Sequence, residues 1–396
     1  LAIALEPGQK GFFRIPYSRP DLKPGKEYRI TLSSVLRKDA IWASAGHEVA
    51  WEQFELPAWR LPSVPEAATG GAVSLERSSE RITAVADGFR CSFDAVSGAL
   101  VSIETGDGEM MESPLHLNLW RAPVANETDS WGSYSCSGGS YDDTKGYAAA
   151  GAYNPLCGMY HVAHLDDPIF LPSHVEAFEA DGSVYVDVRE LVLFGGNADR
   201  RMQTLEDYLD AGGYAGFESR YLYRIDSGTI TIHHQLCPEG NLPKWLPRIG
   251  LTLSLDGKYE NVSWYGRGPQ ASYPDRKTGY RIGVYGSTVE DMYEPYLIPQ
   301  DYGLRMDTRW VEFRNDSGSG LRISMDTPFA FNAYPFTTGN LTKALYPFQL
   351  QRDGELTVNL DYDTTGVGDT ANGPFEAYRC TACRELERTI TIKTIH

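Results

Sequence analysis

The chain has 396 residues, of which 42% are hydrophobic, and it contains 39 glycines and 23 prolines. This length exceeds one ordinary domain, and short apolar runs between turn residues indicate many strands instead of long helices. The net charge of −17 argues against binding to nucleic acid or to an anionic membrane surface, because both recruit Lys and Arg. No apolar run approaches the ~20 residues that are needed to cross a bilayer.

The first segment carries the pattern of a half-buried strand. Within residues 26–36, Tyr28, Ile30 and Leu32 recur at every second position and therefore lie on one face. Residues 56–71 then change to a sequence with three prolines and a glycine pair, which cannot continue a sheet. We predict a small sandwich domain over residues 1–60, a linker over 61–71, and a second domain from residue 72 to 396.

Strand patterns fill much of the second domain. Alternating apolar residues occur in residues 184–188, 221–225 and 251–255, and the turn at 226–228 predicts a hairpin. Because strands do not alternate with helical patterns, we predict an all-β, antiparallel sandwich. Residues 128–160 are rich in Gly, Ser, Tyr and Asp, and we interpret them as a long excursion from the sheet.

Motifs of other chemistries are weak. Gly266-Arg267-Gly268-Pro269 leads into proline, which prevents a helix N-terminus that could hold phosphate, so we predict a tight structural turn. His233 and His234 are adjacent on a predicted strand and point to opposite faces, so they cannot bind one metal together. Cys380 and Cys383 form one CxxC pair without a second pair, and we interpret them as inert thiols.

Four stretches carry a resemblance to a known family. WYGRGPQASYPDRKTG (residues 264–279) and DMYEPYLIPQDYGLRMDTRWVEF (291–313) together resemble the terminal domain of family 2 β-galactosidases. NLWRAPVANE (118–127) is similar to the RAP-x-x-N segment of that domain, and WASAGHEVAWEQFEL (42–56) is similar to the end of the domain that precedes it.

The resemblance implies a fold and a parent enzyme. It implies a partial immunoglobulin-like sandwich followed by a large antiparallel supersandwich of the galactose-mutarotase-like type. In this family the two catalytic glutamates lie on a (β/α)₈ barrel that precedes these domains, so none of the catalytic residues is assigned to this chain. The start at Leu1, without an initiator Met, leads us to expect a segment of a longer polypeptide.

The parent enzyme implied by the resemblance hydrolyses terminal β-D-galactosides with retention of configuration. Its substrate would reach this chain through the missing barrel domain, and the enzyme would be a homo-oligomer. Magnesium and sodium, which the family often uses, would bind on the barrel, so we expect no cofactor or metal in this segment. Nucleic acid and membranes are not expected partners, and the sequence makes no prediction about the compartment.

Two loops would line the sugar pocket if the resemblance holds. The first follows Arg121, which we interpret as an anchor for the loop. Its predicted substrate-binding residues are Asn126, Glu127, Asp129 and Trp131.

The second loop lies in LTVNLDYDTTGVGDTANG (residues 356–373), which is similar to the GxGGDxSW loop of the family. Asp369 and Asn372 are its predicted substrate-binding residues, although Asn372 lies where the family has a tryptophan that stacks on the leaving sugar. An equal alternative is that this loop contacts no sugar. For Tyr273-Pro274-Asp275-Arg276 we favour a structural role, in which Asp and Arg tie loops together by hydrogen bonds.

Three hypotheses for function follow. The first is that the chain forms walls of a β-galactosidase pocket and is inactive alone. The second is a carbohydrate-binding module without chemistry, because aromatic residues in loops can stack on sugars. The third is an aldose epimerase, which needs a histidine and a carboxylate as paired acid and base. We rank the epimerase last, because His233 and His234 are predicted on a strand.

Overall fold

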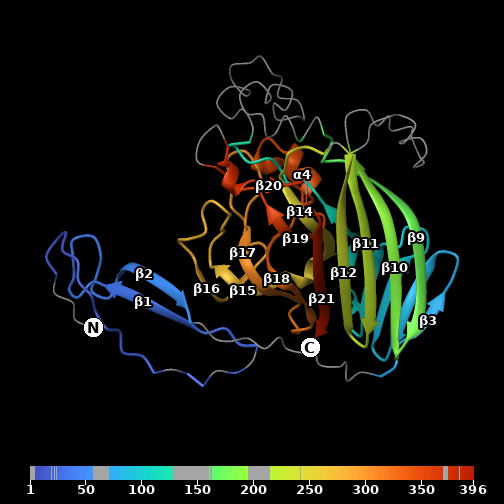
Figure 1. Cartoon of the computed structure of the whole chain (residues 1–396), viewed down its shortest axis with the longest axis horizontal. Helices are drawn as coiled ribbons and strands as arrows, with labels where there is room; N and C mark the ends of the chain where they lie inside the picture. Colours follow the sequence, from blue (N-terminus) through green and yellow to red (C-terminus); the bar gives the residue numbers. More distant parts are fainter. Residues whose placement is uncertain are drawn as a thin grey trace, which may run out of the picture. The chain divides into compact units, whose positions relative to one another are not determined.

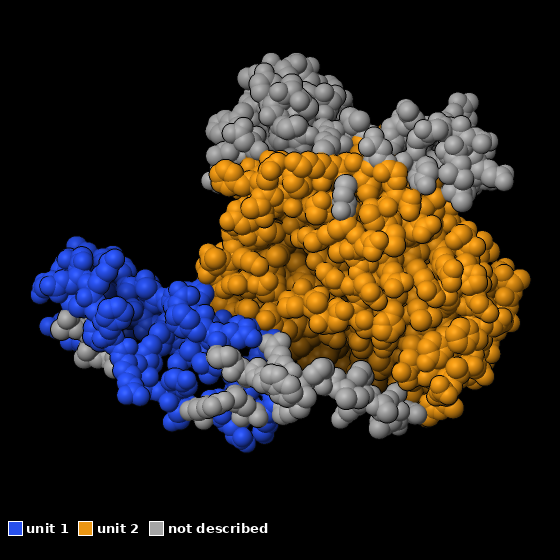
Figure 2. Space-filling model, viewed as in Figure 1, with its two compact units in different colours: residues 1–67 blue, residues 68–396 orange. Residues whose placement is uncertain are grey.

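The chain forms two compact units, residues 1–67 and 68–396, which Figure 2 shows in different colours. The structure, a computed structural model, describes residues 5–18, 20, 21, 23, 25–56, 71–127, 160, 163–194, 215–240, 242–368, 373–382 and 384–396. Most of the linker that we predict at 61–71 lies outside these residues. Within the described part, no helix is long and apolar enough to cross a membrane.

The first unit contains one antiparallel pair of strands. Strand β1 (Arg29–Val35) pairs with β2 (Glu48–Glu55), and the register places Ile30 opposite Phe54. The strand that alternation predicted within residues 26–36 is therefore confirmed. A single two-stranded pair is marginally stable in water, and both strands remain largely exposed among the described residues.

The second unit is built from two runs of antiparallel strands. Sheet I is the run β9-β10-β11-β12-β21-β18-β17-β15-β16, of which β9 to β12 are the long neighbouring green strands in Figure 1. Its strands are β9 (Ile169–Ala180), β10 (Ser183–Phe194), β11 (Ala215–Asp226), β12 (Thr229–Gly240), β21 (Leu386–Ile395), β18 (Gly320–Tyr334), β17 (Arg305–Arg314), β15 (Asn261–Gly268) and β16 (Arg281–Thr288).

Sheet II is the run β18-β19-β14-β8-β6-β5-β4-β3. Its strands besides β18 are β19 (Glu355–Thr364), β14 (Arg248–Asp256), β8 (Met111–Asn118), β6 (Leu100–Thr105), β5 (Phe89–Asp94), β4 (Arg81–Ala86) and β3 (Ser74–Arg77). The short elements are β7 (Gly108–Glu109), β13 (Trp245–Leu246), β20 (Cys380–Thr381), helix α4 (Thr338–Lys343) and the 3₁₀ turns η1 (Gly257–Tyr259), η2 (Pro347–Gln349) and η3 (Glu376–Tyr378).

Strand β18 belongs to both sheets because it is 15 residues long. Its first part, Gly320–Met325, pairs with β21 of sheet I, and its last part, Ala330–Tyr334, pairs with β19 of sheet II. The predicted all-β, antiparallel class is therefore confirmed. The hairpin predicted at residues 226–228 is confirmed as well, because β11 ends at Asp226 and β12 begins at Thr229.

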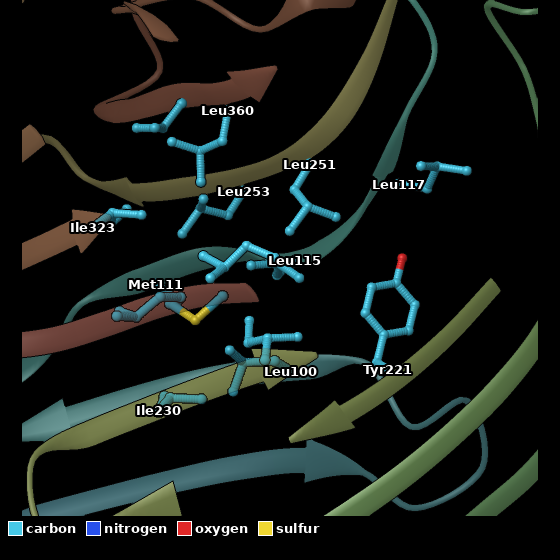
Figure 3. Packing of buried hydrophobic residues seen from close by; sticks show 14 of the residues in the cluster. Leu100, Met111, Leu115, Leu117, Tyr221, Ile230, Leu251, Leu253, Ile323 and Leu360 are labelled. Carbon is cyan, nitrogen blue, oxygen red and sulfur yellow. The ribbon is translucent and has the colours of Figure 1, made fainter. Parts of the chain in front are cut away.

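One hydrophobic cluster fills the space between the two sheets. The rings of Phe93 on β5 and Tyr223 on β11 meet edge to face, with their centroids 4.8 Å apart. Figure 3 shows side chains of both sheets in this cluster, among them Leu115, Leu251 and Leu360 of sheet II and Tyr221, Ile230 and Ile323 of sheet I.

The opposite face of sheet II is polar although much of it is buried. On β14 the apolar residues Leu251, Leu253 and Leu255 lie in the core, so Thr252 and Ser254 between them point to the other face. The register places Asn359 opposite Thr252 and Thr357 opposite Ser254 on β19. Sheet II therefore has a hydrophobic face against sheet I and a polar face, which forms the base of the second cavity described below.

We predict a tight turn at residues 266–269. This prediction is wrong for Gly266 and Gly268, because both lie in strand β15. A Cβ atom on Gly266 would lie 2.8 Å from the Thr308 hydroxyl oxygen, and one on Gly268 would lie 2.7 Å from the Tyr285 ring. Close packing of the strands against these glycines explains them better than a turn does.

Replacing Phe331 with alanine tests the core. Phe331 is fully buried on β18 and contacts the Trp264 and Phe313 rings. Phe331→Ala is expected to lower the free energy of unfolding by about 3–5 kcal/mol, because it removes buried area and leaves a cavity. Phe348→Ala, at an 81% exposed position, is the matched control and should change stability by less than about 0.5 kcal/mol. Equal losses in urea unfolding would contradict the described core.

Candidate functional site

Four segments that are distant in the sequence meet at one cavity of ≈ 400 Å³. They lie in the four stretches of the second unit that resemble the family, residues 118–127, 264–279, 291–313 and 356–373. The cavity is lined by residues 123–126, by Tyr273 and Arg276, by residues 296–298 with Gln300 and Asp301, and by Val367 and Gly368. We call it the first cavity.

The segment 121–127 is folded around a buried ion pair. Arg121 Nη2 donates to Glu127 Oε1 at 2.7 Å, and neither side chain is exposed to solvent. The other carboxylate oxygen, Glu127 Oε2, accepts from the backbone N–H of Val124 at 3.2 Å. The ion pair thus closes a compact turn at the edge of the first cavity.

Arg121 also holds the segment that carries the second predicted loop. Its guanidinium donates to the carbonyl oxygens of Thr365 at 2.6 Å and of Gly366 at 2.9 Å. These bonds confirm the prediction that Arg121 is an anchor. They fix residues 365–366 beside the turn at 121–127, since a buried guanidinium must donate to nearby acceptors.

Asp275 ties the YPDR motif to the same segment. Its carboxylate oxygens accept from the backbone N–H groups of Val367 at 3.1 Å and of Gly368 at 2.6 Å. A Cβ atom on Gly366 would lie 2.5 Å from Asp275 Cγ, so only glycine allows this approach. The structural role predicted for Asp275 is confirmed by these bonds.

Two further side chains join the lining segments. Asn126 Nδ2 donates to the Val367 carbonyl oxygen at 2.9 Å. The side-chain oxygen of Gln300 accepts from the backbone N–H of Ala125 at 2.7 Å. Residues 123–126 are therefore bonded on one side to the 366–368 segment and on the other to the segment around Gln300.

Asp301 connects the first cavity to the polar face of sheet II. Its Oδ2 accepts from the Tyr273 hydroxyl at 2.8 Å, and its Oδ1 accepts from Arg248 Nη2 at 2.7 Å and from Asn332 Nδ2 at 3.2 Å. The Tyr334 hydroxyl donates to the same Oδ1 atom. Because Asp301 is 1% exposed, this set of donors offsets the cost of burying its charge.

A second carboxyl group, Asp361 on β19, is buried beside this network. Asp361 Oδ1 lies 3.7 Å from Arg248 Nε, and among the described residues neither carboxyl oxygen has a hydrogen-bond partner. Burial raises the pKa of Asp361 to about 7, although the Arg248 charge acts in the opposite direction. Near neutral pH this carboxyl group therefore exists in both protonation states.

The six predicted substrate-binding residues have different outcomes. Asn126 lines the first cavity. Glu127 is fully buried and both of its oxygens are bonded within its own turn, so its contact with a substrate stays a prediction. Asp129, Trp131, Asp369 and Asn372 lie outside the described residues.

Four residues that line the first cavity were not among the predicted substrate-binding residues, namely Arg276, Tyr296, Leu297 and Gln300. We interpreted the YPDR motif as structural and assigned no role to YEPYLIPQD. The sequence did contain a signal for these residues, because the stretches 264–279 and 291–313, which resemble the family, carry polar and aromatic residues. Leu297 is 84% exposed, so it presents an apolar side chain at the cavity rim.

The two adjacent histidines lie away from the first cavity lining. His234 is buried, and its ring atoms Nε2 and Nδ1 lie 3.1 Å from the Ser219 hydroxyl oxygen and 2.7 Å from the Tyr362 hydroxyl oxygen. Burial lowers the pKa of His234 to about 3, so the ring is neutral. His233 is exposed on the other face of β12 and pairs with Thr389. The prediction that the two histidines point to opposite faces of a strand is confirmed.

Burial raises the pKa of the Cys380 thiol far above its ordinary value, so this group is inert. Cys383 lies outside the described residues. Within the described ranges, no three His, Cys, Asp or Glu side chains are grouped to hold a metal ion. The expectation that magnesium and sodium would bind on the barrel stays a prediction.

Two known families match most of the chain. Residues 85–392 match the family described as beta galactosidase small chain, and residues 1–57 match the family described as beta-galactosidase, domain 4. The first match covers well over half of the sequence. The chain belongs to the beta galactosidase small chain family.

Curated relatives agree with this assignment. The chain is 28% identical to a beta-galactosidase of Priestia megaterium (strain DSM 319 / IMG 1521) over 93% of this chain and 32% of the relative. It is 25% identical to a beta-galactosidase of Pseudoalteromonas haloplanktis over 87% of this chain and 30% of that relative. The chain thus spans about a third of the length of these relatives.

Solved structures include a galactose mutarotase-like protein from Clostridium acetobutylicum. It aligns with a TM-score of 0.41 and 7% identity, over 83% of this chain and 99% of the other.

Breaking the buried ion pair tests the anchoring role of Arg121. Arg121→Met is expected to lower the free energy of unfolding by about 3–5 kcal/mol, because it leaves the Glu127 charge buried without a partner. The control is Arg352→Met, which removes an exposed pair with Glu290 and should cost less than about 1 kcal/mol. Urea unfolding measures both, and a similar small loss in each variant would contradict the anchor.

Replacing Asp361 with asparagine tests its protonation. The folded-state pKa is raised from 3.8 to about 7, so the folded protein binds this proton more tightly than the unfolded chain does. The stability from this group is complete below pH 3.8 and is lost as the pH rises through about 7. Asp361→Asn should remove this loss, which amounts to at most about 4 kcal/mol. Asp291→Asn, at an exposed position, should leave the pH dependence of urea unfolding unchanged, and an unchanged profile in Asp361→Asn would refute the assignment.

Proposed function

We propose that the polypeptide containing this chain hydrolyses terminal β-D-galactosides with retention, and that this chain forms one wall of the sugar pocket. The observation that carries the proposal is the convergence of four motif segments on the first cavity. Membership of the beta galactosidase small chain family supports the substrate class. The relatives named beta-galactosidase support the reaction class.

The lining of the first cavity suits recognition of a sugar. Tyr296, which is partly exposed, offers an aromatic ring, while Asn126, Arg276 and Gln300 offer groups that can hydrogen-bond hydroxyls. Arg276 lies over the Tyr273 ring, with its guanidinium carbon 5.0 Å from the ring centroid. An exposed guanidinium held over an aromatic ring is a defined donor for a hydroxyl group at the cavity rim.

The carboxyl groups of the described residues do not supply a catalytic pair. Retaining hydrolysis needs two carboxyl groups about 5 Å apart that both face the sugar. In the described part of the chain, Asp301 is the one acidic residue that lines the first cavity, and all its oxygens accept bonds from protein donors. The proposal therefore places both catalytic glutamates outside this chain, and the purified chain alone should not hydrolyse galactosides.

The second predicted loop remains part of the proposal. Of its anchor, residues 365–368, Val367 and Gly368 line the first cavity. Asp369 and Asn372 would contact the leaving sugar by hydrogen bonds instead of ring stacking, since asparagine offers an amide where the family has an indole.

Arg276→Ala in the complete polypeptide tests the proposed function. The expected result is a loss of roughly tenfold or more in kcat/KM for lactose, because a hydrogen bond from a charged group to the substrate is removed. The control is Arg81→Ala, which removes an exposed arginine of β4 and should leave kcat/KM unchanged. Wild-type kinetics in Arg276→Ala would contradict the proposed wall.

Activity of the purified 396-residue chain on a chromogenic β-galactoside would overturn the assignment of catalysis to other segments. Calorimetric binding of galactose together with no hydrolysis by the complete polypeptide would favour the binding-module hypothesis instead.

A further inference from the structure

A second cavity of ≈ 540 Å³ lies on the polar face of sheet II, apart from the first cavity in its lining residues. Strands β8, β14 and β19 form its base, and residues 165–168 and 337–343 form its sides. Figure 1 labels α4, β14 and β19, which contribute residues to this lining. No step of the proposed hydrolysis uses this cavity.

Side-chain hydroxyl groups dominate the lining of the second cavity. The hydroxyl-bearing residues include Ser113, Thr252, Ser254, Thr338, Thr342 and Thr357. Ser254 and Thr357 lie opposite each other on β14 and β19, and each is 6% exposed. Within the described residues, neither hydroxyl group makes a hydrogen bond in the protein. Neither hydroxyl oxygen is among the buried polar atoms without a partner, so both are accessible from the cavity and are free to bond a ligand.

His116 adds an acceptor to this set. Its Nδ1 atom lies 3.0 Å from the Leu117 carbonyl oxygen, which can only accept, so Nδ1 carries the proton. Burial lowers the pKa of His116, which keeps the ring neutral and leaves Nε2 as an acceptor. The cavity therefore offers hydroxyl groups that both donate and accept, together with one neutral imidazole.

The charged groups around the second cavity have both signs. Lys343 lines the cavity together with three carboxylates, Asp166, Asp167 and Glu355. An anion would meet three carboxylates and is therefore disfavoured, whereas the hydroxyl groups of a neutral ligand can donate hydrogen bonds to carboxylates. The lining also contains the Trp120 indole, whose Nε1 donates to the Thr342 hydroxyl oxygen at 3.1 Å.

A ladder of amide side chains holds the base of the second cavity in place. Asn118 Nδ2 donates to Asn359 Oδ1 at 2.9 Å, and Asn359 Nδ2 donates to Asn332 Oδ1 at 3.0 Å. Asn332 Nδ2 in turn donates to Asp301 at the first cavity. The ladder orders the base before any ligand arrives, which lowers the entropic cost of binding.

We infer that the second cavity is a binding site for a neutral saccharide. A saccharide supplies many hydroxyl groups that donate and accept in the same way as the lining, carries no charge, and fits a cavity of this size. The unbonded hydroxyl groups of Ser254 and Thr357 are its primary contacts. This inference does not depend on the proposed hydrolytic function.

Chemical footprinting of Lys343 with galactose as the probe tests the inference in the complete polypeptide. Lys343 lines the second cavity and is exposed, so bound galactose should slow its acetylation by acetic anhydride, as read by mass spectrometry. Lys393, exposed on β21, is the control and should react at the same rate with and without galactose. Absence of protection at Lys343 up to saturating galactose overturns the inference.

The pair Ser254→Ala and Thr357→Val removes both hydroxyl groups with little change in shape. The double variant should need roughly tenfold more galactose to protect Lys343, because two hydrogen bonds are lost. Thr231→Val on β12, which removes a hydroxyl group from sheet I, should leave protection unchanged. A double variant that protects Lys343 like the unaltered protein overturns the inference.

Inhibition of galactoside hydrolysis by galactose separates this inference from the proposed function. Hydrolysis reports the proposed active site, whereas protection of Lys343 reports the second cavity. The double variant should keep the same galactose inhibition of hydrolysis while losing protection. A polypeptide without hydrolysis would refute the proposed function and leave the footprinting result valid.

Discussion

The buried guanidinium group of Arg121 is the interaction on which the first cavity depends. It lies in a short turn, yet its acceptors are Glu127 on the same turn and the carbonyl oxygens of Thr365 and Gly366, more than 240 residues later. A guanidinium removed from water must donate to several acceptors or the fold loses several kcal/mol. These hydrogen bonds hold the turn at residues 121–127 against residues 365–366, and both segments border the first cavity.

The second determining feature is the two-faced character of sheet II. One face packs against sheet I through aliphatic residues such as Leu251 and Leu360. The other face is polar and buried, and it is ordered by the ladder from Asn118 to Asp301. Because buried amides and carboxylates are stable only when they bond one another, this face is rigid. It connects the two cavities through hydrogen bonds instead of through packing.

Much of the fold could be predicted from local patterns. Period-two alternation identified strands such as β1 and β14, and the Asp226-Ser227-Gly228 turn identified a hairpin, because these signals depend on neighbouring residues alone. Gly266 and Gly268 were misplaced in a turn, since their reason is close contact with Thr308 and Tyr285 on other strands. A sequence pattern does not show which strands become neighbours.

The sequence by itself determined the all-β class, the family, the anchoring role of Arg121 and one lining residue of the first cavity, Asn126. Only the tertiary structure decided that Arg276, Gln300 and Asp301 share that cavity, and that Ser254 and Thr357 face a second one. The physical reason is that burial and pairing of polar groups depend on strand order and register. These bring together residues that are far apart in the chain, as the pairs Arg248 with Asp301 (53 apart) and Arg121 with Gly366 (245 apart) illustrate.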